Sequence, residues 1–255
     1  DFSETVTSTG EAGAKKDITK EPFTVLVTGE NEGLADSIIL MSVNPISMKV
    51  TMTSIARDSY VPISCYGSSD KINAAHASSE SCMVKTVENL MGIDIDYTIE
   101  FNFASVVQVV DAVGGVDVEN DTPFYGQSWD LTTNELNVIP IPYGGLVHMN
   151  GAEALGFVRE RMAYADGDFA RQRHQQAVIE DIINKIMTSK SPQMFLDILD
   201  AAGNNIKTNF TVEQMTGFIN YALQKAKRYY NEGDISGLFN FESSRVYGYA
   251  ANLWN

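Results

Sequence analysis

Four of the seven arginines in this chain fall within fifteen residues, although the formal net charge of the protein is −15 at pH 7. The four are Arg159, Arg161, Arg171 and Arg173. A guanidinium group presents a rigid fork of hydrogen-bond donors that fits two phosphate oxygens at once. A cluster of such groups on an acidic chain therefore predicts a site for a small, highly charged anion, and not for a long polyanion.

The arginine-rich segment runs into a long predicted helix that starts at Asp168, its expected capping residue. Arg171 and Gln175 lie one turn apart on this helix, in line with its predicted buried face. That face consists of Val178, Ile179, Ile182, Ile183 and Ile186. An arginine near a helix start meets the positive end of the helix dipole, which is unfavourable unless an anion lies between them. The partner of Arg171 is either a bound anion or an acid such as Asp166 or Asp168. Arg173, about 200° around the helix from Arg171, is predicted to be exposed.

Arg159 and Arg161 fall at the end of the preceding predicted helix, which begins after Asn150. Asn150 and Glu153 have the spacing of a capping box. Cations near a helix C-terminus are favourable for its dipole, so helix capping explains one of the two arginines. Their position shortly before a core-facing arginine favours an anion site, and Arg57, just past a predicted strand, is a further candidate for it.

Two carboxylates, Glu30 and Asp36, bracket a turn that contains Gly33 and joins the first two predicted strands. Both are expected at one edge of a sheet. Carboxylates beside arginines suit a hard divalent cation that bridges the oxygens of a bound phosphate. The alternative interpretation is an acidic turn that is simply exposed to solvent.

The chain has two cysteines, Cys65 and Cys82, separated by a segment rich in Ser, Gly and Ala. Two free buried thiols are one interpretation, and a metal site would need two more ligands nearby. We favour a disulfide that closes a surface loop, which requires an oxidising compartment. Closing such a loop typically adds about 3 kcal/mol, mainly by restricting the unfolded chain.

The bulk composition excludes several classes of function. A pI near 4.5 disfavours broad binding to nucleic acid or to anionic lipid through a basic face. No stretch reaches the length of about 18 apolar residues that spans a bilayer. The chain begins at Asp1, which is typical of a mature or truncated ectodomain, so we expect any membrane anchor upstream and a flexible linker over residues 1–20. Zinc spacing, a Walker loop and a dinucleotide fingerprint are absent from the sequence.

Strands and helices alternate from residue 21 to residue 255 without an obvious linker, which predicts one α/β domain with helices on both faces of its sheet. The predicted strands are 23–28, 37–43, 49–55, 97–101 and 116–118, with weaker ones near 235–241 and 245–249. The predicted helices are 81–91, 103–113, 151–158, 168–188, 192–202 and 211–229. Residues 119–147 are predicted to be loop with short strands.

A set of motifs between about Pro22 and about Lys190 resembles, in order, the LytR–CpsA–Psr family of cell-wall glycopolymer ligases. The motifs are VTGE (27–30), ADS (35–37), SIARDSYV (54–61), KINAAHA (71–77), VVDAVGGVDV (109–118), and VRER (158–161) with GDFAR (167–171) and Gln175. One of them alone would be weak, but the ordered set is specific. Residues after 190 contribute no motif.

The resemblance implies an α-β-α fold around a mixed sheet, with a long apolar groove for a polyprenyl chain. It implies a phosphotransferase on the extracellular face of the cell membrane. Its donor would be a polyprenyl-pyrophosphate-linked glycan, and its acceptor a hydroxyl of peptidoglycan. The glycan phosphate would be transferred and polyprenyl phosphate would leave.

Carried onto this sequence, the resemblance implies pyrophosphate binding by basic and amide side chains and Mg²⁺ binding by carboxylates. The pyrophosphate-binding set is Arg57, Lys71, Arg159, Arg161, Arg171 and Gln175. The magnesium set is Glu30 and Asp36. Catalysis would fall to Asp36, Arg57, Arg159 and Arg161, with Asp36 or a nearby acid taking the proton of the acceptor hydroxyl.

The chain departs from the family pattern at the carboxylate turn. The family usually has aspartate where Glu30 stands, and commonly an arginine where this chain has Leu34-Ala35. The first change loosens the near-octahedral geometry that Mg²⁺ demands, and the second removes one phosphate contact. Two alternatives therefore stay open: a hydrolase that uses water as the acceptor, and a non-catalytic module that binds lipid phosphates or regulates.

Overall fold

The computed structural model describes residues 16–189, 191–229 and 238–246. The chain divides into two compact units that interleave along the sequence. Within the described residues, we call 16–101, 207–211 and 240–246 the sheet unit, and 102–189, 191–206, 212–229 and 238–239 the helical unit.

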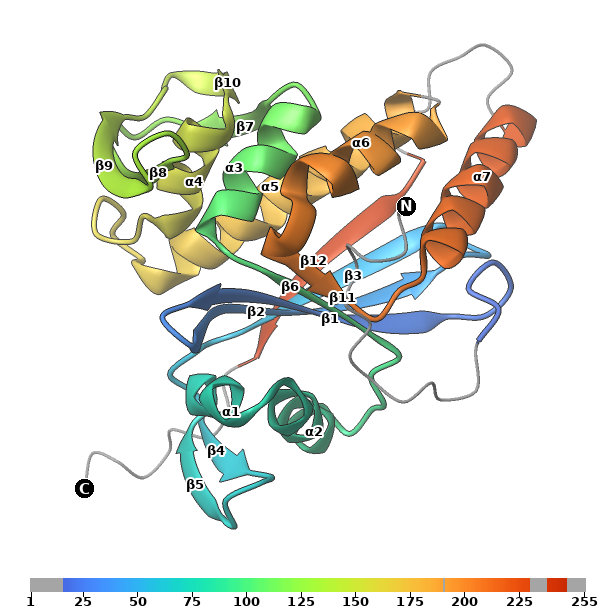
Figure 1. Ribbon diagram of the computed structural model, residues 1–255, viewed down its shortest axis with the longest axis horizontal. Helices are drawn as coiled ribbons and strands as arrows, with labels where there is room; N and C mark the ends of the chain where they lie inside the picture. The colour runs from blue at the N-terminus through green and yellow to red at the C-terminus, as the bar shows by residue number, and fades with distance from the viewer. Residues whose placement is uncertain (1–15, 190, 230–237, 247–255) are drawn as a thin grey trace. The chain divides into compact units, whose positions relative to one another are not determined.

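The sheet unit is built on a six-stranded mixed sheet (Figure 1). In spatial order the strands are β11 (Ile206–Thr208), β6 (Tyr97–Phe101), β1 (Phe23–Asn31), β2 (Leu34–Asn44), β3 (Lys49–Ile55) and β12 (Asn240–Val246). The pairs β1–β2 and β2–β3 are antiparallel, whereas β1–β6 and β3–β12 are parallel. The end of β1, the start of β2, the end of β3 and the end of β6 therefore lie at the same end of the sheet.

Two helices and a small hairpin complete the sheet unit. They are α1 (Asn73–Ser78), α2 (Glu80–Met91), β4 (Tyr60–Ile63) and β5 (Ser68–Lys71). Buried side chains of the sheet pack with buried side chains of α1 and α2, among them Leu26, Ile38, Ala75 and Met83. Figure 1 shows these helices against one face of the sheet. Sequence patterns did not predict β4, β5 and α1, because these elements are only four to six residues long.

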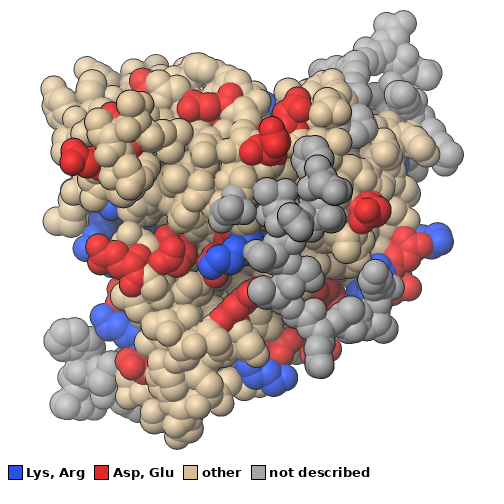
Figure 2. All heavy atoms as spheres, in the orientation of Figure 1, with Lys and Arg blue, Asp and Glu red and all other residues tan. Residues whose placement is uncertain are grey.

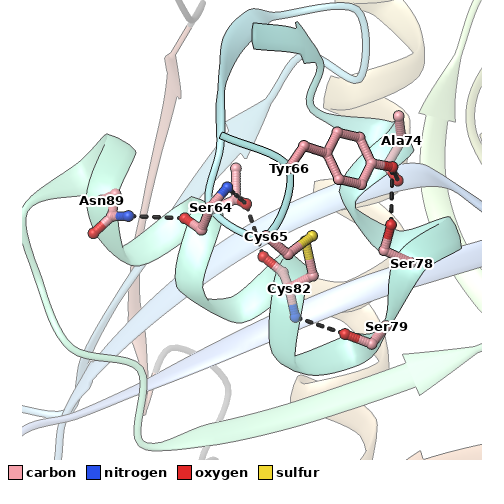
Figure 3. The surroundings of a disulfide bond; sticks show 9 residues. Ser64, Cys65, Tyr66, Ala74, Ser78, Ser79, Cys82 and Asn89 are labelled. Atoms are coloured by element: carbon pink, nitrogen blue, oxygen red, sulfur yellow. Dashed lines mark hydrogen bonds between the residues drawn. A yellow bond between two sulfur atoms is a disulfide. The ribbon is translucent and has the colours of Figure 1, made fainter. Parts of the chain in front are cut away.

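The predicted disulfide between Cys65 and Cys82 is confirmed, with a Cα–Cα distance of 5.6 Å. It joins the β4–β5 turn to the first turn of α2, where Ser79 caps the helix by accepting a hydrogen bond from the Cys82 amide (Figure 3). The hydroxyl of Tyr66 donates to the Ala74 carbonyl at 2.9 Å. The loop that the disulfide closes is therefore also tied to α1.

The helical unit contains five helices and four short strands among the described residues. The helices are α3 (Phe103–Ala112), α4 (Gly151–Arg159), α5 (Asp168–Thr188), α6 (Pro192–Ala202) and α7 (Val212–Tyr229). The strands are β7 (Val116–Asn120), β8 (Tyr125–Asp130), β9 (Glu135–Pro140) and β10 (Gly145–Met149), paired β7–β10 and β8–β9. Their common core includes Val110, Met149, Leu155 and Phe157.

The start of α4 is fixed by three local features. Asn150 and Glu153 form the predicted capping box. The Gly151 amide donates to the Asp111 carboxylate at 2.7 Å. A Cβ at Gly151 would lie 2.2 Å from the Val107 carbonyl oxygen, so only glycine allows α3 and α4 to approach this closely. These contacts set the direction of the helix that ends at Arg159.

Most predicted elements are present, and the predicted α/β class with a central mixed sheet is confirmed. One prediction about α5 is wrong. Gly167, with a φ of 53°, is the capping residue, and Asp168 is the first residue of the helix and makes no capping hydrogen bond. Of the apolar residues predicted to be buried on α5, Val178 is buried and the rest are half-buried.

Two predictions reach the undescribed ends of the chain. The weak strands predicted near 235–241 and 245–249 are replaced by one strand, β12, and residues 235–237 and 247–249 lie outside the described residues. Within the predicted linker 1–20, residues 1–15 lie outside the described residues. Ile18 is buried and Lys16 pairs with Asp96 at 2.8 Å.

Candidate functional site

The two predicted carboxylates lie at the tip of the β1–β2 hairpin. The register shifts between Gly29, which pairs with Ser37, and Glu30, which pairs with Ala35, so Asp36 is the extra residue of a β-bulge. A bulge breaks the strict alternation of side chains and re-aims the extra residue, and bulges are common next to active sites. Both carboxylates are therefore at one end of the sheet, as predicted.

Arg57 connects this hairpin to β3 and α1. Its Nη1 donates to the Asp36 carboxylate, which also accepts from the Asn31 amide at 3.3 Å. Arg57 lies two residues beyond β3 and is half-buried, with its side chain 22% exposed. Its Nε is buried without a hydrogen-bond partner among the described residues, and the Asp58 carboxylate lies 3.7 Å from it. A buried donor without a partner typically costs about 1–3 kcal/mol, so Arg57 retains a donor that an anionic ligand can use.

Lys71 lies next to Asp58, the second acidic neighbour of Arg57. It is the last residue of β5, and its Nζ pairs with Asp58 at 2.7 Å. The side chain is 59% exposed, which makes this ion pair worth little to stability but leaves the ammonium group free to move to a ligand. The structure thus brings Glu30, Asp36, Arg57 and Lys71 to one end of the sheet unit. The strand pattern predicted this for the two carboxylates, and the family resemblance implied it for Lys71.

Sequence reasoning missed three further charged residues at this end of the sheet. His76 Nε2 lies 2.9 Å from the Glu100 carboxylate, whose other oxygen is 2.6 Å from Lys207 Nζ. The hydrogen bond from His76, followed by that from Lys207, lowers the pKa of Glu100 to about 2. His76 stands in the KINAAHA motif and Glu100 near the end of a predicted strand, so two of the three had a local signal. Lys207 had none.

In the helical unit, Arg159 is the last residue of α4 and lies flat against an aromatic ring. Its guanidinium carbon is 4.0 Å from the centroid of the Phe103 ring, a cation–π contact. Its Nη1 also donates to the Gln127 carbonyl at 3.4 Å. The start of α3 and strand β8 therefore fix the direction of this side chain. Arg161, two residues beyond the helix, is exposed.

Arg171 lies in the first turn of α5 and is 7% exposed. Its Nη2 pairs with the Asp168 carboxylate at 2.5 Å, and Asp168 also accepts from Gln172 at 2.9 Å. This is one of the two alternatives that the sequence left open for Arg171. The amide of Gln175, one turn further, donates to the Val158 carbonyl at 3.3 Å and so ties α5 to the end of α4.

Arg173 differs from Arg171 in burial, as predicted. Its side chain is 47% exposed and pairs with Asp166. The residue after Arg173, His174, is 8% exposed and stacks on Phe157 with ring centroids 4.0 Å apart. Burial lowers the pKa of His174 to about 4, so its ring is neutral at physiological pH. Arg159, Arg171 and Gln175 thus lie around the α4–α5 connection.

The carboxylates of the hairpin fit part of a magnesium site. Among the described residues, no group of three or more His, Cys, Asp or Glu side chains is placed to hold a metal ion. Mg²⁺ is commonly bound through one or two carboxylates, with water and substrate phosphates as its other ligands. An ionised carboxylate has about four acceptor positions. The bonds from Arg57 and Asn31 to Asp36, and from Gly33 to Glu30, leave some of these positions open.

These features define a mixed α/β protein that carries guanidinium, ammonium and carboxylate groups suited to a phosphorylated ligand. The chain belongs to the LytR_cpsA_psr family, whose model matches residues 3–250. It is 35% identical over 205 residues to the polyisoprenyl-teichoic acid–peptidoglycan teichoic acid transferase TagU of Enterococcus faecalis. That match covers 77% of this chain, which spans 64% of the length of the relative.

Solved structures show the same similarity. TagU of B. subtilis is 36% identical, with a TM-score of 0.60 over 77% of this chain and 80% of that one. The structure of TagT bound to LI-WTA is 29% identical, with a TM-score of 0.69 over 92% of this chain and 82% of that one. In the part of this chain that the structure describes, no helix has the length and apolarity needed to cross a membrane.

Proposed function

We propose that this protein transfers a teichoic acid or a related glycopolymer from a polyprenyl-pyrophosphate carrier to peptidoglycan. The observation that carries the proposal is the similarity to TagU together with the charged residues at the matching family motifs. Arg57 adds physical support, because its buried Nε lacks a hydrogen-bond partner among the described residues and suits an anion.

The proposed chemistry is a phosphoryl transfer. The acceptor hydroxyl attacks the phosphorus that bears the glycan, a new P–O bond forms, and the bond to the bridging oxygen breaks. Polyprenyl phosphate leaves with the electron pair of that bond. Such reactions depend on positioning and charge neutralisation more than on covalent help from the protein. An apolar groove for the polyprenyl chain is part of the proposal.

The proposed roles follow the residues. Arg57, Lys71, Arg159, Arg161, Arg171 and Gln175 bind pyrophosphate oxygens. Asp36 is an ionisable group near Arg57 and is the proposed acceptor of the hydroxyl proton. Glu30 and Asp36 would hold Mg²⁺, which supplies further positive charge to the phosphate oxygens when bound.

The disulfide supports a place for the reaction outside the cytoplasm. Structural disulfides persist in oxidising compartments and are rare in the cytosol. The Cys65–Cys82 bond is of this kind, because it closes a loop and joins two elements of the sheet unit. Peptidoglycan, the proposed acceptor, is an extracellular polymer, so the compartment and the proposed substrate agree.

The experiment that tests the proposal is a transfer assay with a polyprenyl-pyrophosphate-linked glycan, with and without peptidoglycan. Transfer predicts glycan attached to peptidoglycan and release of polyprenyl phosphate only when the acceptor is present. Release of glycan phosphate without acceptor identifies a hydrolase instead. Tight donor binding with no turnover in either arm identifies a non-catalytic module.

Two arginines of α5 provide a matched control. Arg171→Ala removes a proposed pyrophosphate ligand, whereas Arg173→Ala removes an exposed arginine two residues away that already pairs with Asp166. Transfer is expected to fall only in the first variant. Titration of Mg²⁺ into protein treated with a chelator tests the metal, and Asp36→Asn is expected to raise the Mg²⁺ concentration needed for half-maximal transfer.

A further inference from the structure

His76 forms a hydrogen bond with the backbone of the turn between Glu30 and Asp36, the two proposed magnesium ligands. Its Nδ1 lies 3.1 Å from the carbonyl oxygen of Gly33, and its side chain is 9% exposed. A carbonyl oxygen can only accept a hydrogen bond, so this contact requires a proton on Nδ1. The partners of the two ring nitrogens of His76 therefore indicate which of these nitrogens carry a proton.

The second ring nitrogen of His76 faces an acceptor as well. Its Nε2 is 2.9 Å from Glu100, a carboxylate whose pKa is lowered to about 2 and which is therefore ionised. With acceptors on both sides, the ring carries two protons and a positive charge. The hydrogen bond to Glu100 is the largest cause that raises the pKa of His76, and burial opposes it. The other charged groups that face this pair are Lys207 and Glu30.

Gly33 links His76 to a carboxylate of the proposed site. The amide of Gly33 donates to the Glu30 carboxylate at 2.6 Å, while the carbonyl of the same residue accepts from His76. Gly33 and its neighbour Glu32 both have positive φ angles, 84° and 53°. This conformation is strained at Glu32, because residues other than glycine rarely adopt it. His76 adds a contact to this turn from outside the hairpin.

We propose that His76 is a positioning residue. It holds the backbone of Gly33 and so orients the Glu30 carboxylate, a proposed magnesium ligand at the bound diphosphate. The proposal rests on the proposed function for its effect on transfer. It does not make His76 a ligand of the substrate, since the two ring nitrogens are already bonded to Gly33 and Glu100.

The arrangement gives the turn a dependence on pH. The contact with Glu100 is complete below the ordinary pKa of histidine and is lost as the pH rises through the raised pKa of His76. Loss of the Nε2 proton then leaves a lone pair facing a carboxylate, which pushes the ring away. Transfer is expected to fall on the alkaline side with the same midpoint.

The first test follows the wild-type protein alone by NMR. The ¹⁵N shifts of the His76 ring report its protonation, and the amide shift of Gly33 reports the turn. We expect the two to titrate with one midpoint above 6.5, the ordinary pKa of histidine. A Gly33 amide that does not follow the ring, or a ring midpoint at or below 6.5, overturns the proposal whether or not the protein is a transferase.

The second test compares transfer kinetics of His76→Phe, His76→Gln and Glu100→Gln, with His148→Gln as the control. His148 is an exposed histidine of the helical unit, paired with Asp117 at 2.8 Å. For His76→Phe we expect kcat to fall by between about 10-fold and about 100-fold with little change in KM, the size typical of misplaced groups. His76→Gln keeps an amide donor and is expected to restore part of the activity without the alkaline loss.

Glu100→Gln is the sharpest variant, because it keeps an acceptor but removes the charge that holds the His76 proton. Its alkaline midpoint is expected at a lower pH than that of the wild type. Wild-type kcat and an unchanged pH profile in His76→Phe contradict the proposal. Absence of transfer by the wild type would instead contradict the proposed function, and the NMR test then decides the role of His76 by itself.

Discussion

At the scale of single residues, two of the arginines predicted to bind an anion are paired with acids. Arg57, which follows β3, pairs with Asp36 of β2, and Arg171 pairs with Asp168 on its own helix. An acidic partner satisfies part of the guanidinium fork and leaves other donors for a ligand. The sequence identified Arg171 from its spacing on the helix and Arg57 from its place after a strand, but for Arg171 it left open whether a carboxylate or a ligand was the partner.

The pairing of Arg171 leads to a measurable prediction. Arg171→Ala is expected to weaken binding of a soluble short-chain polyprenyl pyrophosphate by about 10-fold to 100-fold, the range for charged hydrogen bonds of about 1.5–3 kcal/mol. Calorimetric titration measures this change. Arg173→Ala, which removes an arginine paired with Asp166, is expected to stay within about twofold of the wild type, as is typical for exposed ion pairs. Equal losses in both variants would contradict a specific role for Arg171.

The buried imidazole of His174 predicts how stability depends on pH. Its pKa is about 4 in the folded protein and 6.5 as the ordinary value, so the unfolded chain binds the extra proton between these values. The free energy of unfolding should therefore fall as the pH drops from 6.5 towards 4, by up to about 3 kcal/mol. His174→Phe keeps the stacking on Phe157 and lacks the titration. Urea unfolding of both proteins across this range isolates the difference, which should be absent if the ring is accessible to protons.

At the scale of elements, the sequence predicted what local patterns encode. Strand-like apolar runs located β1 and β2, period-two alternation located β3, and the Asn150–Glu153 spacing located the start of α4. Other features depend on tertiary contacts that no local pattern contains. The bulge at Asp36 follows from pairing between strands, and β8 and β9 run through a segment with little periodicity. In the candidate site, the Arg57–Asp36 pair required knowledge that β2 and β3 are antiparallel neighbours.

Gly29 precedes the bulge and is predicted to be intolerant of a side chain. A Cβ there would lie 3.0 Å from the Phe101 ring and 3.0 Å from the Ser37 Cβ. Gly29→Ala should destabilise the protein by about 1–3 kcal/mol, the usual cost of overpacking. Chemical denaturation measures the loss. Gly217→Ala is a fitting control, since a Cβ at that helical position meets nothing within 4 Å. A Gly29→Ala protein as stable as the wild type would show that Phe101 moves aside freely.

The loop closed by the disulfide contains residues of the candidate site and is expected to contribute to the stability of the protein. The cross-link spans 17 residues in sequence and encloses both Lys71 and His76. Replacing both cysteines by serine should cost about 3 kcal/mol, mainly because the unfolded chain gains freedom. Thermal denaturation with and without a reductant gives the same comparison on the wild-type protein. An unchanged melting temperature in the double variant would mean that the hydrogen bonds around Tyr66 hold the loop by themselves.

At the scale of the whole molecule, the charge of the protein works against a polyanionic substrate. The net charge is −15. On the face drawn in Figure 2, the Lys and Arg side chains form only small patches, which lie beside Asp and Glu side chains. A protein with this net charge does not attract a polyanion at long range. Recognition has to come from short-range contacts with individual guanidinium groups, which is why the proposal centres on a diphosphate and not on the polymer.

The proposed pyrophosphate ligands come from several elements, so the prediction at the scale of the whole molecule concerns their cooperation. Arg159 is the last residue of α4 and Arg171 lies in the first turn of α5. If these two arginines bind one diphosphate, their effects on binding should not add. The double variant Arg159→Ala/Arg171→Ala should show a coupling free energy of about 0.5–3 kcal/mol in a double-mutant cycle, as for groups that share a partner. The cycle of Arg159→Ala with Arg173→Ala should be additive within about 0.5 kcal/mol. Additivity in both cycles, measured by titration with the same pyrophosphate, would mean that Arg159 and Arg171 do not serve a common ligand.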